Sequence, residues 1–300
     1  MQLLNPLPPS DLPAEALYAR LRSRRAGLRT APLPDGIEPV TVETELRAVL
    51  NWVFRRMDRR LRRQLGPYLE IVAMRQLILW LRYRLAKETP PAAVQRSTLI
   101  NLALLDRLET IDAPLRLVET LEALLAADYP LVDGLGETWL KQGPGGVEQQ
   151  LGRGILEHGR AQVRQPTVRQ LILGLIDLRN VLTIVKSWHW QVRAIPRLVA
   201  GGELAGDELL RVWQRQDRRR LSRLVSRVAG HRTDSGQPRG IEKALLDGLT
   251  RRLQRAGRDP LSPALVLDYL WLCQVQAHNR LIRQAGPLLP DGILAEALLA

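Results

Sequence analysis

The chain has 300 residues, of which 45% are hydrophobic and 25% charged, a composition typical of folded globular proteins and not of disordered ones. Leu and Ala dominate over the β-branched and aromatic residues that favour strands, so we expect an all-α fold. The formal net charge of +13 comes mostly from Arg. Such a surface attracts nucleic acid, anionic lipid or an acidic partner, unless the arginines only cover ordinary solvated faces.

The single cysteine and the hydropathy pattern restrict the class of protein further. Cys273 cannot form an internal disulfide, which fits a reducing compartment, and its apolar neighbours predict a buried, unreactive thiol. The Pro-rich segment 1–13 lacks the basic start of a secretory signal. No uncharged apolar stretch reaches the roughly 18 residues that a membrane-spanning helix needs, so we expect no transmembrane span.

The first predicted helices come from capping residues and periodicity. Ser10 and Asp11 precede Pro13 and a helical run over 14–28, and a Pro-rich loop follows over 31–39. Apolar residues then recur every three or four positions and predict one long helix. This apolar stripe consists of Leu46, Leu50, Val53, Met57, Leu61 and Leu65, and the opposite face carries Arg55, Arg59, Arg62 and Arg63.

The rest of the chain also has helical periodicity. We expect helices over 68–87, 97–108 and 114–127, then a looser glycine-punctuated region over 134–146. Further helices are predicted over 147–158, 168–195, 207–228, 240–255 and 262–284, with a short final helix over 291–300. The tryptophans lie mostly in apolar helical patterns, which predicts that they pack in the core.

An internal similarity suggests repeated architecture. Asn180 within 175–182 can be matched to Asn279 within 275–282, and Ala73 takes the Asn place in a third copy over 70–75. The spacing of about a hundred residues is far longer than a solenoid repeat. We therefore predict one subunit over 1–300 made of three similar helical bundles, with approximate bounds 14–110, 111–210 and 211–300.

Motifs for catalysis or for cofactor binding do not occur in the sequence. There is no phosphate-binding loop, no His-Glu-x-x-His, no paired-cysteine spacing and no Gly-x-Ser-x-Gly. The four histidines are scattered over separate predicted elements. We expect no catalytic residue, no cofactor and no metal, and hence a non-catalytic protein.

The arginine clusters are the remaining functional signal. Guanidinium groups could contact phosphates or carboxylates of a partner, although no nucleic-acid-binding motif accompanies them. A basic all-helical nucleic-acid-binding or scaffold protein therefore stays as an alternative. The candidate partner-binding residues are Arg55, Arg59, Arg62, Arg63, Arg215, Arg219 and Arg223.

Three stretches, in consistent order along the chain, resemble one known family. Tyr18-Ala19-Arg20-Leu21-Arg22 opens the first helix, an Asp-x-x-Asn helix leads to a Gly-Gly turn, and a Tyr-Leu helix with an Asn-x-Leu step closes the chain. This series resembles the non-catalytic C-type (also called d-type) adapter of V/A-type rotary ATPases, in a divergent bacterial-like form. The residues that carry the later two motifs are Asp177, Asn180, Lys186, Gly201, Gly202, Tyr269 and Asn279.

The resemblance implies a funnel-shaped, pseudo-threefold, all-helical subunit that performs no chemistry. Members of that family join the central stalk to the membrane proteolipid ring of a proton- or sodium-translocating ATPase or ATP synthase. It thus implies stalk and ring subunits as partners, and a peripheral position on the cytoplasmic face of the membrane. Under this interpretation the seven motif residues maintain the fold, and nucleic acid is disfavoured as a partner.

Overall fold

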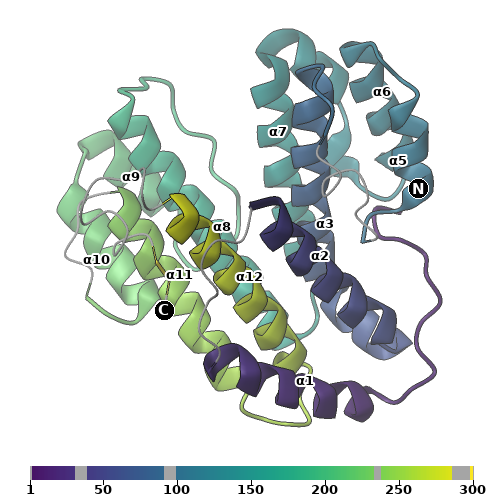
Figure 1. The fold of residues 1–300 in the computed structure, drawn as a ribbon. Helices are drawn as coiled ribbons and strands as arrows, with labels where there is room; N and C mark the ends of the chain where they lie inside the picture. Colours follow the sequence, from purple (N-terminus) through teal and green to yellow (C-terminus); the bar gives the residue numbers. More distant parts are fainter. Residues whose placement is uncertain (1, 31–38, 91–98, 233–237, 286–297, 300) are drawn as a thin grey trace. The chain divides into compact units, whose positions relative to one another are not determined.

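A computed structural model describes residues 2–30, 39–90, 99–232, 238–285 and 298–299 (Figure 1). Within these ranges the secondary structure is helical with no strand, and one isolated antiparallel bridge joins Leu4 to Ile100. The prediction of an all-α fold is confirmed. The predicted final helix over 291–300 lies almost wholly outside the described residues.

The chain forms two compact units, each of which takes two segments of the sequence. One unit combines Met1–Ala14 with Glu43–Val163, and the other combines Glu15–Val42 with Arg164–Ala300. The expected first bundle, 14–110, therefore contributes residues to both units. The division into three repeats stays a prediction.

The first unit is built around two long helices, α3 (Arg59–Leu85) and α7 (Leu135–Gln162), which pack along each other. Arg82 of α3 donates from Nε and Nη2 to the two carboxylate oxygens of Glu148 on α7, at 2.7 and 2.6 Å. The shorter helices of this unit are α5 (Leu102–Glu109), α6 (Pro114–Leu125) and the 3₁₀ turn η1 (Pro130–Val132). Most of α2 (Pro39–Arg56) also belongs to it.

The predicted long helix over 46–65 is wrong in one respect, because it is divided between α2 and α3. Asp58 lies between them, and its side chain accepts a hydrogen bond from the Leu61 N–H at 2.7 Å, which caps α3. The helix then continues through Gly66 and Pro67, where a boundary was expected. The apolar stripe is buried on both sides of the break, since Val53 of α2 and Leu61 of α3 are at most 1% exposed.

The glycine-rich region over 134–146 is helical rather than loose. It forms the first half of α7, with a kink at Gly143, whose φ of 65° and ψ of −159° lie outside helical values. Glycine adopts this conformation without the steric cost that a Cβ would bring, and Pro144 follows directly. The kink lets the helical path resume and bury Val147 and Leu151.

The second unit contains α1 (Ala14–Thr30), α8 (Pro166–His189), α9 (Gly206–Arg215), α10 (Arg218–Ala229), α11 (Pro238–Ala256) and α12 (Ala264–Ala285). Helix α11 packs against α8, α10 and α12, and so lies at the centre of this unit. The aliphatic side chains of α8 to α11, among them Ile184, Val212, Val225 and Leu245, form one buried cluster.

Two helices of this unit end earlier than periodicity predicts, both in the same motif. Gln191 follows α8 with φ of 53°, and Gln216 follows α9 with φ of 51°. After α8, the Val192 N–H donates to the Ser187 carbonyl and the Gln191 N–H to the Trp188 carbonyl, which is the Schellman pattern. Periodicity could not reveal these ends, because the apolar spacing continues past both glutamines.

Candidate functional site

The centre of the Asp-x-x-Asn motif is a pair of polar side chains on α8 that hold the backbone of the following loop. Asp177 and Asn180 are three residues apart, so both face the same side of the helix. Their partners are the backbone groups of Val199, Glu203 and Leu204 in the segment that leads to α9. The motif thus positions the Gly-Gly turn, which lies between these partners in the sequence.

Asn180 makes a two-point contact with one residue. Its Nδ2 donates to the Val199 carbonyl at 2.9 Å, and its Oδ1 accepts from the Val199 N–H at 2.7 Å. We call this pairing of one Asn amide with both backbone groups of a later residue an asparagine clamp. Asn180 is 1% exposed and Val199 2% exposed, so water cannot readily substitute for either bond.

Asp177 holds the other end of the same turn. It is fully buried, and its two carboxylate oxygens accept from the N–H groups of Glu203 and Leu204, both at 3.0 Å. Burial raises the pKa of Asp177 to about 6, and these two hydrogen bonds oppose the increase. A Cβ on Gly202 would lie 2.1 Å from Asp177 Oδ1, so the close approach of turn and carboxylate requires glycine there.

Gly201 and Gly202 are therefore brought together with Asp177 and Asn180, and Gly201 has a φ of 91° that favours glycine. Lys186 is not part of this arrangement. Its side chain is exposed on the last turn of α8, where its carbonyl accepts from the Trp190 N–H at 2.9 Å.

The closing motif contains a second asparagine clamp. Asn279 of α12 donates from Nδ2 to the Leu299 carbonyl at 2.9 Å and accepts at Oδ1 from the Leu299 N–H at 2.8 Å. The partner is 20 positions later in the sequence, against 19 for Asn180. Both Asn279 and Leu299 are half-buried. The matched asparagines thus make the same type of contact.

Tyr269 does not take part in the second clamp. It lies ten residues before Asn279 on α12, about 15 Å along the helix axis. It is 2% exposed and hydrogen-bonds with Arg24 and Cys273, and burial raises its pKa to about 12. Burial also raises the pKa of the Cys273 thiol to about 12, in agreement with the unreactive thiol that its neighbours predict.

Sequence reasoning missed a buried ion pair in the same unit. Arg25 of α1 lies 2.5 Å from a carboxylate oxygen of Asp268 on α12, and it donates from Nη1 to the Gly257 carbonyl at 2.9 Å. Asp268 is fully buried. A single acidic residue within the apolar run 264–273 was the available signal, because a buried carboxylate needs a partner.

The Arg55–Arg63 cluster is divided by the helix break. Arg55 is exposed on α2, whereas Arg59 and Arg63 are exposed on the first turns of α3. Arg62 has a structural role instead: it donates to the carbonyls of Leu7 and Pro8, stacks 4.5 Å from the Phe54 ring centroid, and has its pKa lowered by desolvation. Arg62 therefore anchors the N-terminal segment and is a poor candidate for partner contact.

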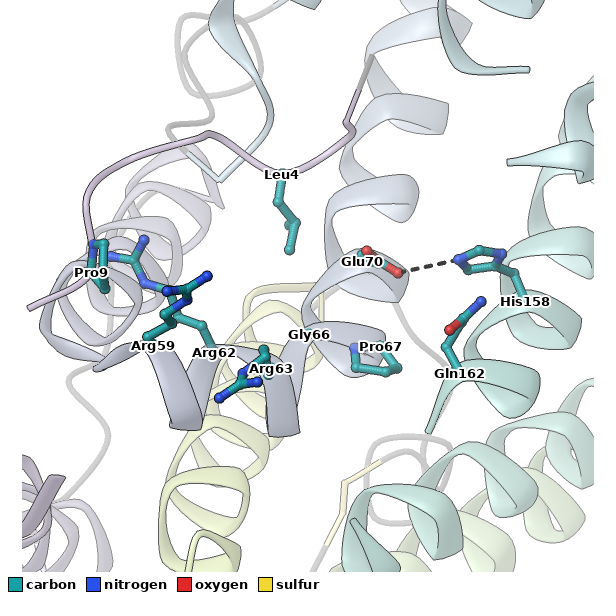
Figure 2. Close-up of a pocket in the computed structure, with 10 residues that line it drawn as sticks. All are labelled: Leu4, Pro9, Arg59, Arg62, Arg63, Gly66, Pro67, Glu70, His158 and Gln162. Atoms are coloured by element: carbon teal, nitrogen blue, oxygen red, sulfur yellow. Dashed lines mark ion pairs between the residues drawn. The ribbon is translucent and has the colours of Figure 1, made fainter. Parts of the chain in front are cut away.

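A cavity of about 580 Å³ opens beside these arginines within the first unit. Figure 2 shows the arginine side chains on one side and Glu70 with His158 on the other. The residues that line it are Leu4, Pro9, Arg59, Arg62, Arg63, Gly66, Pro67, Glu70, His158 and Gln162. Sequence reasoning did not predict that Glu70 and His158 would meet here.

The acidic side of the cavity is a small polar cluster. Glu70 accepts from the Tyr129 hydroxyl at 3.1 Å and lies 3.8 Å from His158 Nε2. Burial raises the pKa of Glu70 and lowers the pKa of His158, so both shifts disfavour the charged form of the pair. The two sides of the cavity thus have opposite character: three cationic side chains face a carboxyl and an imidazole of reduced basicity.

The second arginine cluster lies on α9 and α10, which the predicted helix over 207–228 joins but the structure separates. Arg215, Arg219 and Arg223 are exposed. Arg220 and Arg227 instead pair with Glu208 at 3.0 and 3.7 Å, which lowers the pKa of that carboxyl. The three candidate residues of this cluster are therefore available to a partner.

Within the described ranges, no group of His, Cys, Asp and Glu side chains has the geometry of a metal site. No helix in that part of the chain is long and apolar enough to cross a membrane.

Comparison with known families finds no family model that matches the chain. Comparison with curated proteins finds no significant match.

Proposed function

We propose that this chain is a non-catalytic rotor adapter of a V/A-type rotary ATPase or ATP synthase, which couples the central stalk to the membrane proteolipid ring. The observation that supports the proposal most is the recurrence of the asparagine clamp. The two motifs with which the sequence resembles this adapter family contain Asn180 and Asn279, and each holds a residue 19 or 20 positions later. A shared amphipathic pattern does not by itself require the same two-point backbone contact at both asparagines.

The clamps suit an element that transmits torque. A rotor adapter must hold its partners in fixed geometry, so the segments that follow its long helices have to be rigid. Asp177 and Asn180 fix one such segment with four hydrogen bonds to backbone groups. In this proposal the protein is funnel-shaped, contains three related bundles and lies against the cytoplasmic face of the membrane.

The contacts with partners would involve the exposed arginines and not a catalytic pocket. Stable assemblies commonly bury on the order of 2,000 Å² or more, so several side chains must contribute. Arg55, Arg59 and Arg63 are exposed in one unit, and Arg215, Arg219 and Arg223 in the other. Guanidinium groups pair bidentately with carboxylates, so acidic loops of the stalk or ring are the expected counterparts.

Purification of a tagged chain from detergent-solubilised membranes tests the proposal. We expect proteolipid ring and stalk subunits to co-elute with it. Salt-sensitive retention on DNA, without ring or stalk subunits, would instead support the alternative of a basic nucleic-acid-binding protein.

Charge reversal tests the arginine contacts. The variant Arg55→Glu, Arg59→Glu, Arg63→Glu leaves the anchoring Arg62 intact and should weaken co-elution at moderate salt. A matched control reverses three exposed arginines elsewhere in the same unit, Arg107, Arg116 and Arg160. If both variants co-elute as the unmodified chain does, the first cluster takes no part in assembly.

A further inference from the structure

The segment between α8 and α9 exposes apolar side chains that a monomeric protein would normally bury. Trp190 is 65% exposed, Val192 45% and Ile195 67%. The sequence predicts a helix to residue 195 with core tryptophans, and Trp190 contradicts both expectations because α8 ends at His189. Three large apolar residues with exposed side chains thus lie within six positions, a local density that singly scattered surface residues do not reach.

The charges along this segment are all positive. Lys186, Arg193 and Arg197 have exposed side chains. The sequence contains no Asp or Glu between Asp177 and Glu203. Asp177 is fully buried, and Glu203 pairs with Arg252 at 2.7 Å. The exposed apolar residues are thus interleaved with cations and have no acidic neighbour along the segment.

Both ends of the segment are fixed to the second unit. The Schellman motif at Gln191 fixes its start, and the Asn180 clamp on Val199 fixes its end. The adjoining indoles reinforce the start: Trp213 Nε1 donates to Ser187 Oγ at 2.8 Å, and Trp188 Nε1 donates to the Trp213 carbonyl at 3.3 Å. Little conformational entropy would be lost if residues 190–197 contacted a surface.

We propose that residues 186–197 dock the protein on a lipid surface that carries anionic headgroups. Trp side chains prefer the boundary between water and hydrocarbon, and Ile195 and Val192 add apolar area beside it. Each cation near an anionic leaflet strengthens binding about fivefold, and stable peripheral binding generally needs two combined signals. This segment supplies both the apolar and the electrostatic signal. The proposal concerns the isolated chain and holds whether or not the chain is a rotor adapter.

Co-flotation of the purified full chain with vesicles tests this proposal. We expect binding to vesicles of equal parts phosphatidylcholine and phosphatidylglycerol, and weak binding to phosphatidylcholine alone. The double variant Trp190→Ser, Ile195→Ser should lower the vesicle partition coefficient at least about tenfold, because both apolar side chains would otherwise enter the interface. The double variant Arg193→Glu, Arg197→Glu should lower it similarly and remove the dependence on anionic lipid.

The control is the double variant Leu140→Ser, Leu261→Ser, which removes two equally exposed apolar residues outside the segment, 71% and 70% exposed. It should bind as the unmodified chain does. Circular dichroism verifies that each variant is folded, because all the substituted side chains are exposed. Equal binding to neutral and anionic vesicles, no binding to either, or equal losses in the segment and control variants would each overturn the proposal.

Discussion

The two asparagine clamps have the same geometry in different surroundings. Asn180 is 1% exposed and pairs with a buried Val199, whereas Asn279 and its partner Leu299 are both half-buried. The bond lengths differ by at most 0.1 Å between the two sites. The two contacts therefore have the same geometry, but burial determines how much stability each one contributes, because exposed backbone groups can bond with water instead.

The residue one turn before each asparagine distinguishes the clamps further. At the first clamp this is Asp177, which accepts from two more N–H groups of the same loop. At the second it is Gln276, which donates to the Leu28 carbonyl at the end of α1. The first site therefore concentrates four bonds on one loop, while the second divides its bonds between two segments. We expect substitutions to have larger effects at the first site.

Asn180→Ala should have the largest effect on stability. It leaves the N–H and the carbonyl of Val199 without partners in a buried place, at a cost of about 1–3 kcal/mol for each such group. We expect the free energy of unfolding to decrease by about 3 kcal/mol, as measured by urea denaturation. A decrease below about 0.5 kcal/mol would show that the loop rearranges and that burial does not determine the contribution of the clamp.

Asp177, beside the first clamp, should make the stability of the chain depend on pH, with an effect of similar size. Its folded-state pKa of about 6 exceeds its ordinary value of 3.8, so between these values the folded chain retains a proton that the unfolded chain releases. Its contribution to stability is thus fully present below about pH 4 and is lost as pH increases through 6, by about 3 kcal/mol in total.

Denaturation of the unmodified chain and of Asp177→Asn between pH 4 and 7 measures this contribution, because the other carboxyl groups cancel in the difference. The unmodified chain should become less stable relative to the variant as pH increases. A difference that stays constant, or that changes in the opposite direction, would contradict the raised pKa.

Gly202→Ala should have the next largest effect, a decrease of about 2 kcal/mol in the free energy of unfolding. The added Cβ would lie 2.1 Å from Asp177 Oδ1 and would displace the carboxylate from the Glu203 and Leu204 N–H groups. Gly206→Ala is the matched control, because nothing lies within 4 Å of its Cβ position. Equal stabilities of the two variants, by thermal or urea denaturation, would show that Asp177 and the turn do not depend on close approach.

Periodicity could predict most helices, because the apolar stripe of each helix is what the fold buries. It could not predict the helix boundaries at Asp58, Gln191 and Gln216, where hydrogen bonds of single residues begin or end a helix while the apolar spacing continues. These boundaries depend on the capping side chain of Asp58 and on the positive φ angles of Gln191 and Gln216, which hydropathy does not encode.

The site around Asp177 and Asn180 could be predicted only in part, because the sequence reveals its side chains but not the backbone groups that they bind. Asp177, Asn180 and the two glycines form a recognisable motif, so the resemblance singles them out, but it does not predict that the carboxylate and the turn meet. The partners of Asn180 and Asn279 are backbone groups 19 and 20 positions later, and backbone groups leave no signature in the sequence. The bonds from Arg62 to the carbonyls of residues 7 and 8 are likewise invisible to side-chain patterns, so the sequence groups Arg62 with its exposed neighbours.

Asn279→Ala should have the smallest effect and is the sharpest test of the comparison. The substitution removes the same two bonds as Asn180→Ala, but water can reach the half-buried Leu299 and satisfy its backbone groups. We expect a decrease of about 1 kcal/mol in the free energy of unfolding. Hydrogen exchange of the two partner amides provides an independent measurement: protection at Val199 should greatly exceed protection at Leu299 in the unmodified chain. If instead Asn279→Ala costs as much as Asn180→Ala and the two amides are equally protected, the clamps contribute through their geometry alone. The second clamp would then be an equal structural element of the fold and not its weaker copy.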